Sequence, residues 1–329
     1  MRRREFITLV GGAAAMWPLV TKAQQPAGPV IGFMNAGSSN GLGRLAVAFR
    51  QGLSESGFVE NQNITIEYRW AEGHVEQLPA MAADLVRRHV SVIAATGTQA
   101  ALAAKAATTT IPIVFETAGD PIALGLVGSL NRPSRNVTGI TQLSSELVVK
   151  RLGLLHDLVP HATTVGFLVN PSDPRFVSQT KDIQEAAKRF GVQIQVVNAS
   201  TDAEIENAFA ELGQLQVGAL VVGTGEFFNS RPEKIVGLAD RQHIPAMYQY
   251  RRFAEVGGLI SYGPHITDAY RQAGIYTSRI LKGEKLADLP VVQATKFEMI
   301  INRKAAKTLG LTIPSGVLSI ADEVIEDAS

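Results

Sequence analysis

The 329-residue sequence contains no cysteine, which excludes disulfide bonds, thiolate metal sites, a cysteine nucleophile and a lipid anchor on cysteine. Tryptophan is scarce, with two residues, and the six histidines lie at scattered spacings that match no HExxH or comparable metal motif. These residue types therefore predict no metal site and no cofactor.

A surplus of charge of one sign is also lacking, since 31 lysines and arginines stand against 30 aspartates and glutamates. Without residues 1–23 the balance is 27 to 29, a net charge of −2. Nucleic-acid binding depends on basic groups that neutralise phosphates, so no nucleic-acid partner is expected. Long apolar runs are missing too, and none beyond the N-terminal segment approaches the roughly 18 residues of a membrane span.

Residues 1–23 have the three-part layout of an export signal, with basic Arg2–Arg4, apolar Phe6–Val20 and small residues before a cleavage point. The apolar part is too short for a spanning helix, which needs roughly 20 residues. The stretch Arg3–Ile7 resembles the core of twin-arginine signals, which export folded chains. An ordinary export signal with an extra arginine is the alternative, and either one predicts a cleaved, periplasmic protein.

The rest of the chain alternates short β-branched or apolar runs with amphipathic stretches, which predicts α/β structure with parallel sheets flanked by helices. Two similar series of this kind indicate two Rossmann-like lobes. Candidate strands are Val30–Met34, Ile64–Arg69, Val92–Thr96, Ile111–Phe115, Val165–Val169, Ile194–Val197, Ala219–Val222, Gly257–Gly263 and Phe297–Ile301.

Three long runs carry a family resemblance: GDPIALGLVGSLNRPSRNVTGIT, IPAMYQYRRFAEVGGLISYG and LPVVQATKFEMIINRKAAKTLGLTIP. They resemble those of the periplasmic substrate-binding proteins of ABC transporters, in the family typified by tryptophan- and tyrosine-binding members. The resemblance implies a type I periplasmic-binding fold with three hinge crossings, expected near Val137–Thr141, Arg252–Gly257 and Pro290–Ala294. The expected lobes are 28–138 plus 257–289 and 141–252 plus 291–329.

This resemblance also implies a monomer that captures a small molecule between its lobes and delivers it to a permease and ATPase. A subunit that senses a ligand for a membrane receptor has the same fold and is the main alternative. A dinucleotide-dependent exported enzyme is disfavoured, because the GxGxxG-like run Gly41–Ala46 begins six residues after the first predicted strand, whereas a dinucleotide loop follows its strand directly. No GxSxG elbow or Ser/His/Asp set appears, so no catalytic residue is proposed.

Ligands of open α/β sheets bind beyond the carboxyl ends of the strands, where loops and helix N-termini present free N–H groups. In the first lobe the candidate ligand-binding residues are Asn35, Ser38, Thr96, Gly97, Thr98, Thr117 and Asp120. Thr98 and Asp120 also suit helix capping, and for Asp120, which precedes a proline at an expected helix start, capping is the favoured role.

In the second lobe the candidates are Asn170, Thr224, Glu226, Phe227, Tyr248 and Tyr262. Glu226 can answer a ligand ammonium, and because Phe227 and Phe228 are adjacent, we expect one of them to face the cleft. Each tyrosine can also be a core residue with a solvated hydroxyl. Hydroxyls, N–H groups, one carboxylate and aromatic rings suit a small zwitterion, and with the resemblance they indicate an aromatic amino acid or a related aromatic carboxylate. No cluster of arginines marks the strand ends, which disfavours a polyanion.

Overall fold

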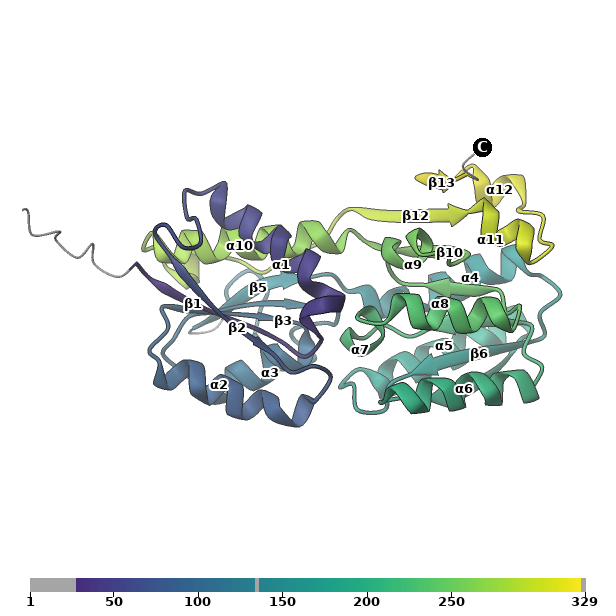
Figure 1. The fold of residues 1–329 in the computed structure, drawn as a ribbon, viewed down its shortest axis with the longest axis horizontal. Helices are drawn as coiled ribbons and strands as arrows, with labels where there is room; N and C mark the ends of the chain where they lie inside the picture. Colours follow the sequence, from purple (N-terminus) through teal and green to yellow (C-terminus); the bar gives the residue numbers. More distant parts are fainter. Residues whose placement is uncertain (1–27, 134–135, 327–329) are drawn as a thin grey trace, which may run out of the picture.

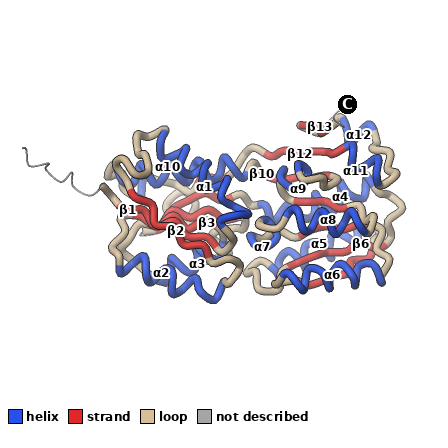
Figure 2. Tube along the Cα trace, in the orientation of Figure 1, coloured by secondary structure: helices blue, strands red, loops and turns tan. Residues whose placement is uncertain are grey.

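The structure is a computed structural model and describes residues 28–133 and 136–326. The predicted export signal, residues 1–23, lies outside the described residues. The chain forms two α/β lobes that lie side by side along the long axis of the molecule (Figure 1). Each lobe is built around one sheet with helices on both faces (Figure 2). The predicted fold class is thus confirmed.

The first lobe contains a six-stranded sheet in the order β11-β5-β4-β3-β1-β2, all of whose pairings are parallel. Its elements are β1 (Val30–Asn35), α1 (Ser39–Ser54), β2 (Thr65–Trp70), α2 (Leu78–Arg87), β3 (Val92–Thr96), α3 (Thr98–Ala107), β4 (Ile113–Thr117), β5 (Val137–Thr141), α10 (Ile266–Leu281) and β11 (Val292–Gln293).

The second lobe contains a seven-stranded sheet in the order β13-β12-β10-β9-β8-β6-β7, in which β10 and β12 pair antiparallel. Its elements are α4 (Val148–Leu158), β6 (Thr164–Val169), α5 (Phe176–Phe190), β7 (Gln193–Asn198), α6 (Asp202–Gln214), β8 (Ala219–Val222), α7 (Glu226–Asn229), α8 (Pro232–Arg241), β9 (Ala246–Tyr248), α9 (Arg251–Glu255), β10 (Ile260–Pro264), β12 (Phe297–Asn302), α11 (Arg303–Thr308), α12 (Ser315–Leu318) and β13 (Glu323–Ile325).

The chain passes between the lobes three times, after β5, between β10 and α10, and between β11 and β12. The crossing predicted at 252–257 is wrong, because β10 pairs with β9 and β12 in the second sheet, and the chain leaves that sheet only at His265. Gly258 serves a local turn instead, since a Cβ there would lie 2.6 Å from the carbonyl oxygen of Phe253. Strand β10 therefore belongs to the second lobe, and residues 291–293 belong to the first.

Apolar packing on both faces of each sheet fixes the strand ends that later form the site. All five residues of β3 are buried, as expected for a central strand of a parallel sheet. On one face of the first sheet, Phe33 packs on Phe49 of α1, with ring centroids 5.2 Å apart, and α10 covers the same face. Helices α2 and α3 cover the opposite face.

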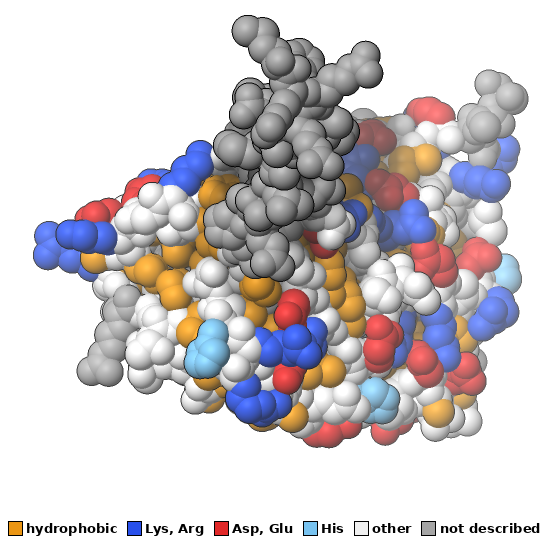
Figure 3. Space-filling model, turned by 60° about the vertical axis from the view of Figure 1, so that its left-hand side comes forward, with side chains coloured by type: hydrophobic (Ala, Val, Ile, Leu, Met, Phe, Trp, Pro, Cys, Tyr) orange, Lys and Arg blue, Asp and Glu red, His pale blue; other side chains and the backbone are white. Residues whose placement is uncertain are grey.

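Within the described ranges, no helix is both long and apolar enough to span a membrane. On the face of the molecule in Figure 3, lysine and arginine side chains lie beside aspartate and glutamate side chains. The visible part of this face thus has the mixed charge that the balanced composition predicts.

Candidate functional site

The loops that follow the strands of both sheets meet between the two lobes. Thr98, which follows β3, donates its backbone N–H to Oε1 of Glu226 at the start of α7, over 3.3 Å. Nearby, Nε2 of Gln99 donates to the carbonyl oxygen of Ser172, over 2.9 Å. The lobes therefore contact each other directly at the place where open α/β sheets bind their ligands.

A cavity of about 210 Å³ lies between the lobes beside these two contacts. It is lined by Ala36, Gly73, His74, Val75, Glu76 and Gln99 of the first lobe and by Asn170, Ser172, Ser200, Thr201 and Phe227 of the second. The ring of Phe227 also lies 4.2 Å from the guanidinium carbon of Arg231. Any molecule in this cavity touches both lobes, so its binding is coupled to their separation.

Four ionisable side chains are buried together beside the cavity. Arg175 makes a two-point ion pair with Asp173, with Nε–Oδ1 at 2.8 Å and Nη2–Oδ2 at 2.6 Å, and its Nη2 lies 3.4 Å from Oε2 of Glu226. Although burial opposes it, the two carboxylates raise the pKa of Arg175 above its ordinary value. The Nη1 atom of Arg175 is buried and has no hydrogen-bond partner.

The fourth ionisable group is Glu116, in β4 of the first lobe. Its Oε2 accepts the N–H of Gly97 over 3.2 Å, and its Oε1 accepts a short hydrogen bond from Nε2 of Gln142. Gln142 in turn accepts from the hydroxyl of Tyr250 over 3.0 Å, which links the cluster to the second lobe. Burial, reinforced by the nearby charge of Glu226, raises the pKa of Glu116 to about 8. Glu116 therefore holds its proton at neutral pH for most of the time.

Arg151 of α4 is fully buried and ties the hinge to the second sheet. Its Nε donates to the carbonyl oxygen of Tyr262, its Nη1 to Oγ1 of Thr224 and its Nη2 to Oγ of Ser144, at 2.7, 3.0 and 2.9 Å. Burial lowers the pKa of Arg151 to about 10, so it stays charged at neutral pH. Because Ser144 lies in the first crossing and Tyr262 in β10, this side chain connects the first crossing to a strand of the second sheet.

In the first lobe, six of the seven predicted residues lie at the strand ends that face the second lobe, and most are buried. Nδ2 of Asn35 donates to the carbonyl oxygen and to Oγ1 of Thr96, both at 2.9 Å, so this pair fixes the ends of β1 and β3. Ser38 caps α1 by accepting the N–H of Gly41. Oγ1 of Thr98 lies 2.7 Å from Oγ1 of Thr117.

Asp120, the seventh, has a local role. Its Oδ1 accepts the N–H of Ile122 over 2.8 Å, which is the capping role that the sequence favoured. The capped segment, however, is a turn and not the expected helix. Gly97 differs from its neighbours in conformation, because its φ of 92° lies in the left-handed region that favours glycine.

In the second lobe, Asn170 and Phe227 line the cavity, Glu226 reaches the first lobe, and Thr224 holds Arg151. Of the adjacent Phe227 and Phe228, one was expected to face the cleft, and Phe227 does line the cavity, although both rings also belong to one apolar cluster of the second lobe.

The two tyrosines take the core role that was left open for them and do not line the cavity between the lobes. Tyr248 is buried in the core of the second lobe and stacks on Phe253, with ring centroids 4.9 Å apart. Tyr262 stacks on Phe297 of the neighbouring strand, and its carbonyl oxygen, not its hydroxyl, meets Arg151. Side chains alternate between the two faces of a sheet, and Tyr248 and Tyr262 pack into the apolar clusters on opposite faces of the second sheet.

Sequence reasoning did not propose several members of this buried network as ligand-binding residues: Glu116, Gln142, Arg151, Asp173 and Arg175. One signal was available for Asp173 and Arg175, since they follow Asn170 in the same predicted strand-end loop. Arg151 lies in α4 among leucines, and nothing in its sequence neighbourhood distinguishes it from a solvent-exposed arginine.

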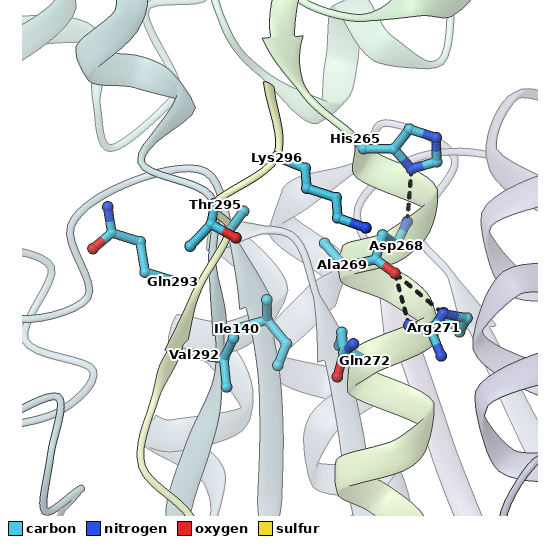
Figure 4. Close-up of a pocket in the computed structure, with 11 residues that line it drawn as sticks. Ile140, His265, Asp268, Ala269, Arg271, Gln272, Val292, Gln293, Thr295 and Lys296 are labelled. Atoms are coloured by element: carbon cyan, nitrogen blue, oxygen red, sulfur yellow. Dashed lines mark hydrogen bonds and ion pairs between the residues drawn. The ribbon is translucent and has the colours of Figure 1, made fainter. Parts of the chain in front are cut away.

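A further cavity, of about 250 Å³, lies at the hinge and not between the strand ends. Figure 4 shows the Lys296 side chain, from the third crossing, extending toward the first turns of α10. There the Asp268 carboxylate accepts from Arg271 at 2.9 and 3.1 Å, and its N–H donates to Nδ1 of His265. Arg271 also pairs with Glu55 at the end of α1, and none of the residues that line this hinge cavity lines the cavity between the lobes.

Among the residues that the structure describes, no three histidine, cysteine, aspartate or glutamate side chains are grouped so as to hold a metal ion. The GxGxxG-like run does not form a dinucleotide loop, because Gly41 and Gly43 both lie inside α1. The groups that meet between the lobes are hydrogen-bond donors, acceptors and paired charges. Such groups can hold a small polar molecule.

Comparison with known proteins agrees with this geometry. Residues 31–325 match the family model described as ABC transporter substrate binding protein. The "Tyrosine-binding protein" of Clostridioides difficile is 28% identical over 271 residues, which cover 82% of this chain and 77% of that protein. This chain therefore belongs to the family of ABC transporter substrate-binding proteins, which is a solute-binding family.

Solved structures give the same fold. A conserved domain protein of Vibrio cholerae superposes with a TM-score of 0.83 at 26% identity, covering 90% of this chain and 99% of that one. An ABC domain in complex with L-Trp from Streptococcus pneumonia gives 0.79 at 27% identity, covering 90% and 100%. The ligand-free, open form of a substrate-binding protein from Clostridium difficile gives 0.63, also at 27% identity, covering 91% and 100%. At equal identity, the chain thus superposes better on the L-Trp complex than on the open form.

Proposed function

We propose that this protein is the extracytoplasmic solute-binding subunit of an ABC importer and that it carries an aromatic amino acid or a related aromatic carboxylate to its permease. The observation that carries the proposal is the meeting of complementary groups across the cleft. The first lobe supplies the N–H groups at the start of α3, and the second supplies the carboxylate of Glu226 and the ring of Phe227. A zwitterion with an aromatic side chain matches all three.

The names of two relatives support the same ligand class, since one is called tyrosine-binding and another was solved with L-Trp. In our proposal the ligand carboxylate binds the N-terminus of α3, where N–H groups and the helix dipole favour an anion. The ammonium binds Glu226. The protein acts by binding and release alone and is not an enzyme.

A thermal-shift screen of the mature protein against amino acids, aromatic acids, sugars and polyanions tests the ligand class. A ligand at 100 times its dissociation constant adds about 2.7 kcal/mol to the free energy of unfolding. We expect an aromatic amino acid or aromatic carboxylate to give the largest shift. A shift with sugars or polyanions and with none of the proposed ligands contradicts the proposal.

Thr98→Val tests the place of the site. The change removes a buried hydroxyl partner and weakens binding of the ligand found in the screen by roughly 1 to 3 kcal/mol in isothermal titration. Thr108→Val is the matched control, because Thr108 is a buried threonine of the first lobe whose hydroxyl bonds only a local turn. Wild-type affinity in Thr98→Val would move the site away from β3.

We further propose export through the twin-arginine-like segment Arg3–Ile7, which would place the protein in the periplasm. Replacing Arg3 and Arg4 together by lysine should then leave the uncleaved precursor in the cytoplasm. Normal processing of the double variant would favour an ordinary export signal.

A further inference from the structure

The carboxylate of Glu226 occupies the position where an anion would bind the first lobe. Its Oε1 lies 3.3 Å from the backbone nitrogen of Thr98, the first residue of α3, and its Oε2 lies 3.4 Å from Nη2 of Arg175. The side chain is buried, with 8% of its surface exposed. Helix α3 has ten residues, and no side chain of its own caps its N-terminus. Glu226, from the other lobe, therefore provides the hydrogen-bond acceptor that a local capping residue would provide.

A second feature of this position points to an anion. Arg175 is 3% exposed, and its Nη1 atom has no hydrogen-bond partner, although its other nitrogens are held by Asp173 and Glu226. A buried guanidinium with a spare donor and a helix N-terminus that lacks a side-chain cap of its own therefore flank the same carboxylate. Each belongs to a different lobe.

Close packing fixes the Glu226 side chain in this place. A Cβ on Gly97 would lie 2.8 Å from Cγ of Glu226, so any larger residue at position 97 would push the side chain away. The φ of 92° at Gly97 turns the chain into α3 at this point. The first lobe thus presents a surface shaped for the Glu226 side chain.

We propose that Glu226 is a built-in substitute for the carboxylate of the ligand: it binds the N-terminus of α3, holds the two lobes together, and gives up this place when a ligand carboxylate arrives. The identity of that ligand rests on the proposed function. Because the ammonium and carboxylate of an α-amino acid are adjacent, the displaced Glu226 lies next to the ammonium and pairs with it. A carboxylate without an ammonium displaces Glu226 and offers it no partner, so the site prefers zwitterions.

Distance measurements between spin labels on the two lobes test this proposal without any amino acid. Since the chain has no cysteine, Val47→Cys in α1 and Val177→Cys in α5 give a unique labelled pair, and both side chains are more than half exposed. In this labelled background we expect one short distance, and Glu226→Ala should transfer most of the population to a longer and broader one. Glu226→Gln, which keeps an acceptor for Thr98 but loses the charge facing Arg175, should shift a smaller part.

Glu233→Ala is the matched control, because Glu233 is an exposed glutamate of α8 whose ion pair with Arg252 stays within the second lobe. This variant should keep the short distance. A Glu226→Ala protein that melts cooperatively and keeps the short distance overturns the proposal. If Glu226→Ala does not melt cooperatively, an unshifted distance in Glu226→Gln overturns it instead.

Acetate provides the complementary test. Titrated into Glu226→Ala, it should refill the vacated carboxylate position and restore the short distance, whereas chloride at the same ionic strength should not. An opened variant that acetate leaves unchanged overturns the assignment of an anion position at α3. Neither measurement depends on the ligand class, so their failure is distinct from a failed thermal-shift screen, which would overturn the proposed function alone.

Discussion

At the scale of single residues, the cleft buries several ionisable groups. The effect of one of them, Glu116, can be measured as a pH dependence of stability. Its folded-state pKa of about 8 lies above the ordinary value of 4.5. A carboxyl whose pKa is raised by folding stabilises the protein below the unfolded pKa, and this contribution is lost as the pH rises through the folded pKa. Between pH 4.5 and 8 the wild-type protein should therefore lose stability relative to Glu116→Gln, by on the order of a few kcal/mol.

Urea unfolding of both proteins at several pH values from 5 to 8 measures this difference. The neutral amide of the variant cannot titrate, so its stability should depend less on pH. Parallel pH profiles for the two proteins would show that Glu116 is not the group responsible.

The buried ion pair of Asp173 and Arg175 leads to a second prediction. Asp173→Ala leaves the guanidinium buried with only the longer contact to Glu226, which should cost about 3 kcal/mol of unfolding free energy. Asp202→Ala is the control, because the Asp202 carboxylate that pairs with Arg231 is 58% exposed, and ion pairs at the surface contribute about 0 to 1 kcal/mol. Equal losses in chemical denaturation of the two variants would contradict the assignment.

At the scale of elements, the contact between α1 and α10 holds the first lobe together. The two helices approach so closely that a Cβ on Gly52 would lie 1.9 Å from the carbonyl oxygen of Arg271, and one on Gly274 would lie 2.1 Å from that of Phe49. Gly52→Ala should therefore destabilise the protein by roughly 1 to 3 kcal/mol or more, because the helices must separate.

Gly43→Ala, in the same helix, should have the opposite effect on stability. A Cβ at Gly43 meets nothing within 4 Å, so the better helix propensity of alanine should raise stability by about 0.5 to 1 kcal/mol. Thermal melts of the two variants compare them directly. The helix packing described here is wrong if Gly52→Ala is also stabilising.

Most of the longer strands could be predicted from sequence, the edge strands β2 and β7 included, while the shortest edge strands could not. Strands β3 and β8 lie where their β-branched and apolar runs place them, Val92–Thr96 and Ala219–Val222, because a buried parallel strand reads as a continuous apolar run. Strand β11 has two residues and β13 has three, too short to carry a pattern. The second crossing was misplaced for a similar reason, since pairing between β10 and β12 depends on residues far away in the chain.

At the scale of the whole molecule, the separation of the lobes is open to a steric test. A Cβ on Gly41, in the first turn of α1, would lie 2.6 Å from the carbonyl oxygen of Ser230 in the other lobe. Gly41→Val should therefore keep the lobes apart and increase the radius of gyration in small-angle scattering, with each lobe still folded. It should also weaken binding of any ligand that needs both lobes.

Gly43→Val is the matched control, because this position in α1 faces open space. It should have the wild-type radius. If both variants scatter alike, the contact between α1 and Ser230 does not limit how closely the lobes approach.

The candidate site could be predicted only as a set of strand ends. Thr98 and Glu226 were identified because each follows a predicted strand, but their contact joins residues 128 positions apart, which no local pattern reports. Arg151 and Glu116 were missed because what distinguishes them is that their ionisable groups are buried away from water. Whether such a group is buried can be seen only in the folded structure.

The exchange of elements between the lobes also has a consequence for biosynthesis. The first sheet receives its covering helix α10 and its edge strand β11 only after the ribosome has made β6 to β10 of the second sheet. Contacts between such distant segments form slowly, because a long loop must close before they contribute. Neither sheet is complete until residue 293 has been synthesised, so translation halted before that point leaves two unfinished sheets with exposed edges and not one finished lobe.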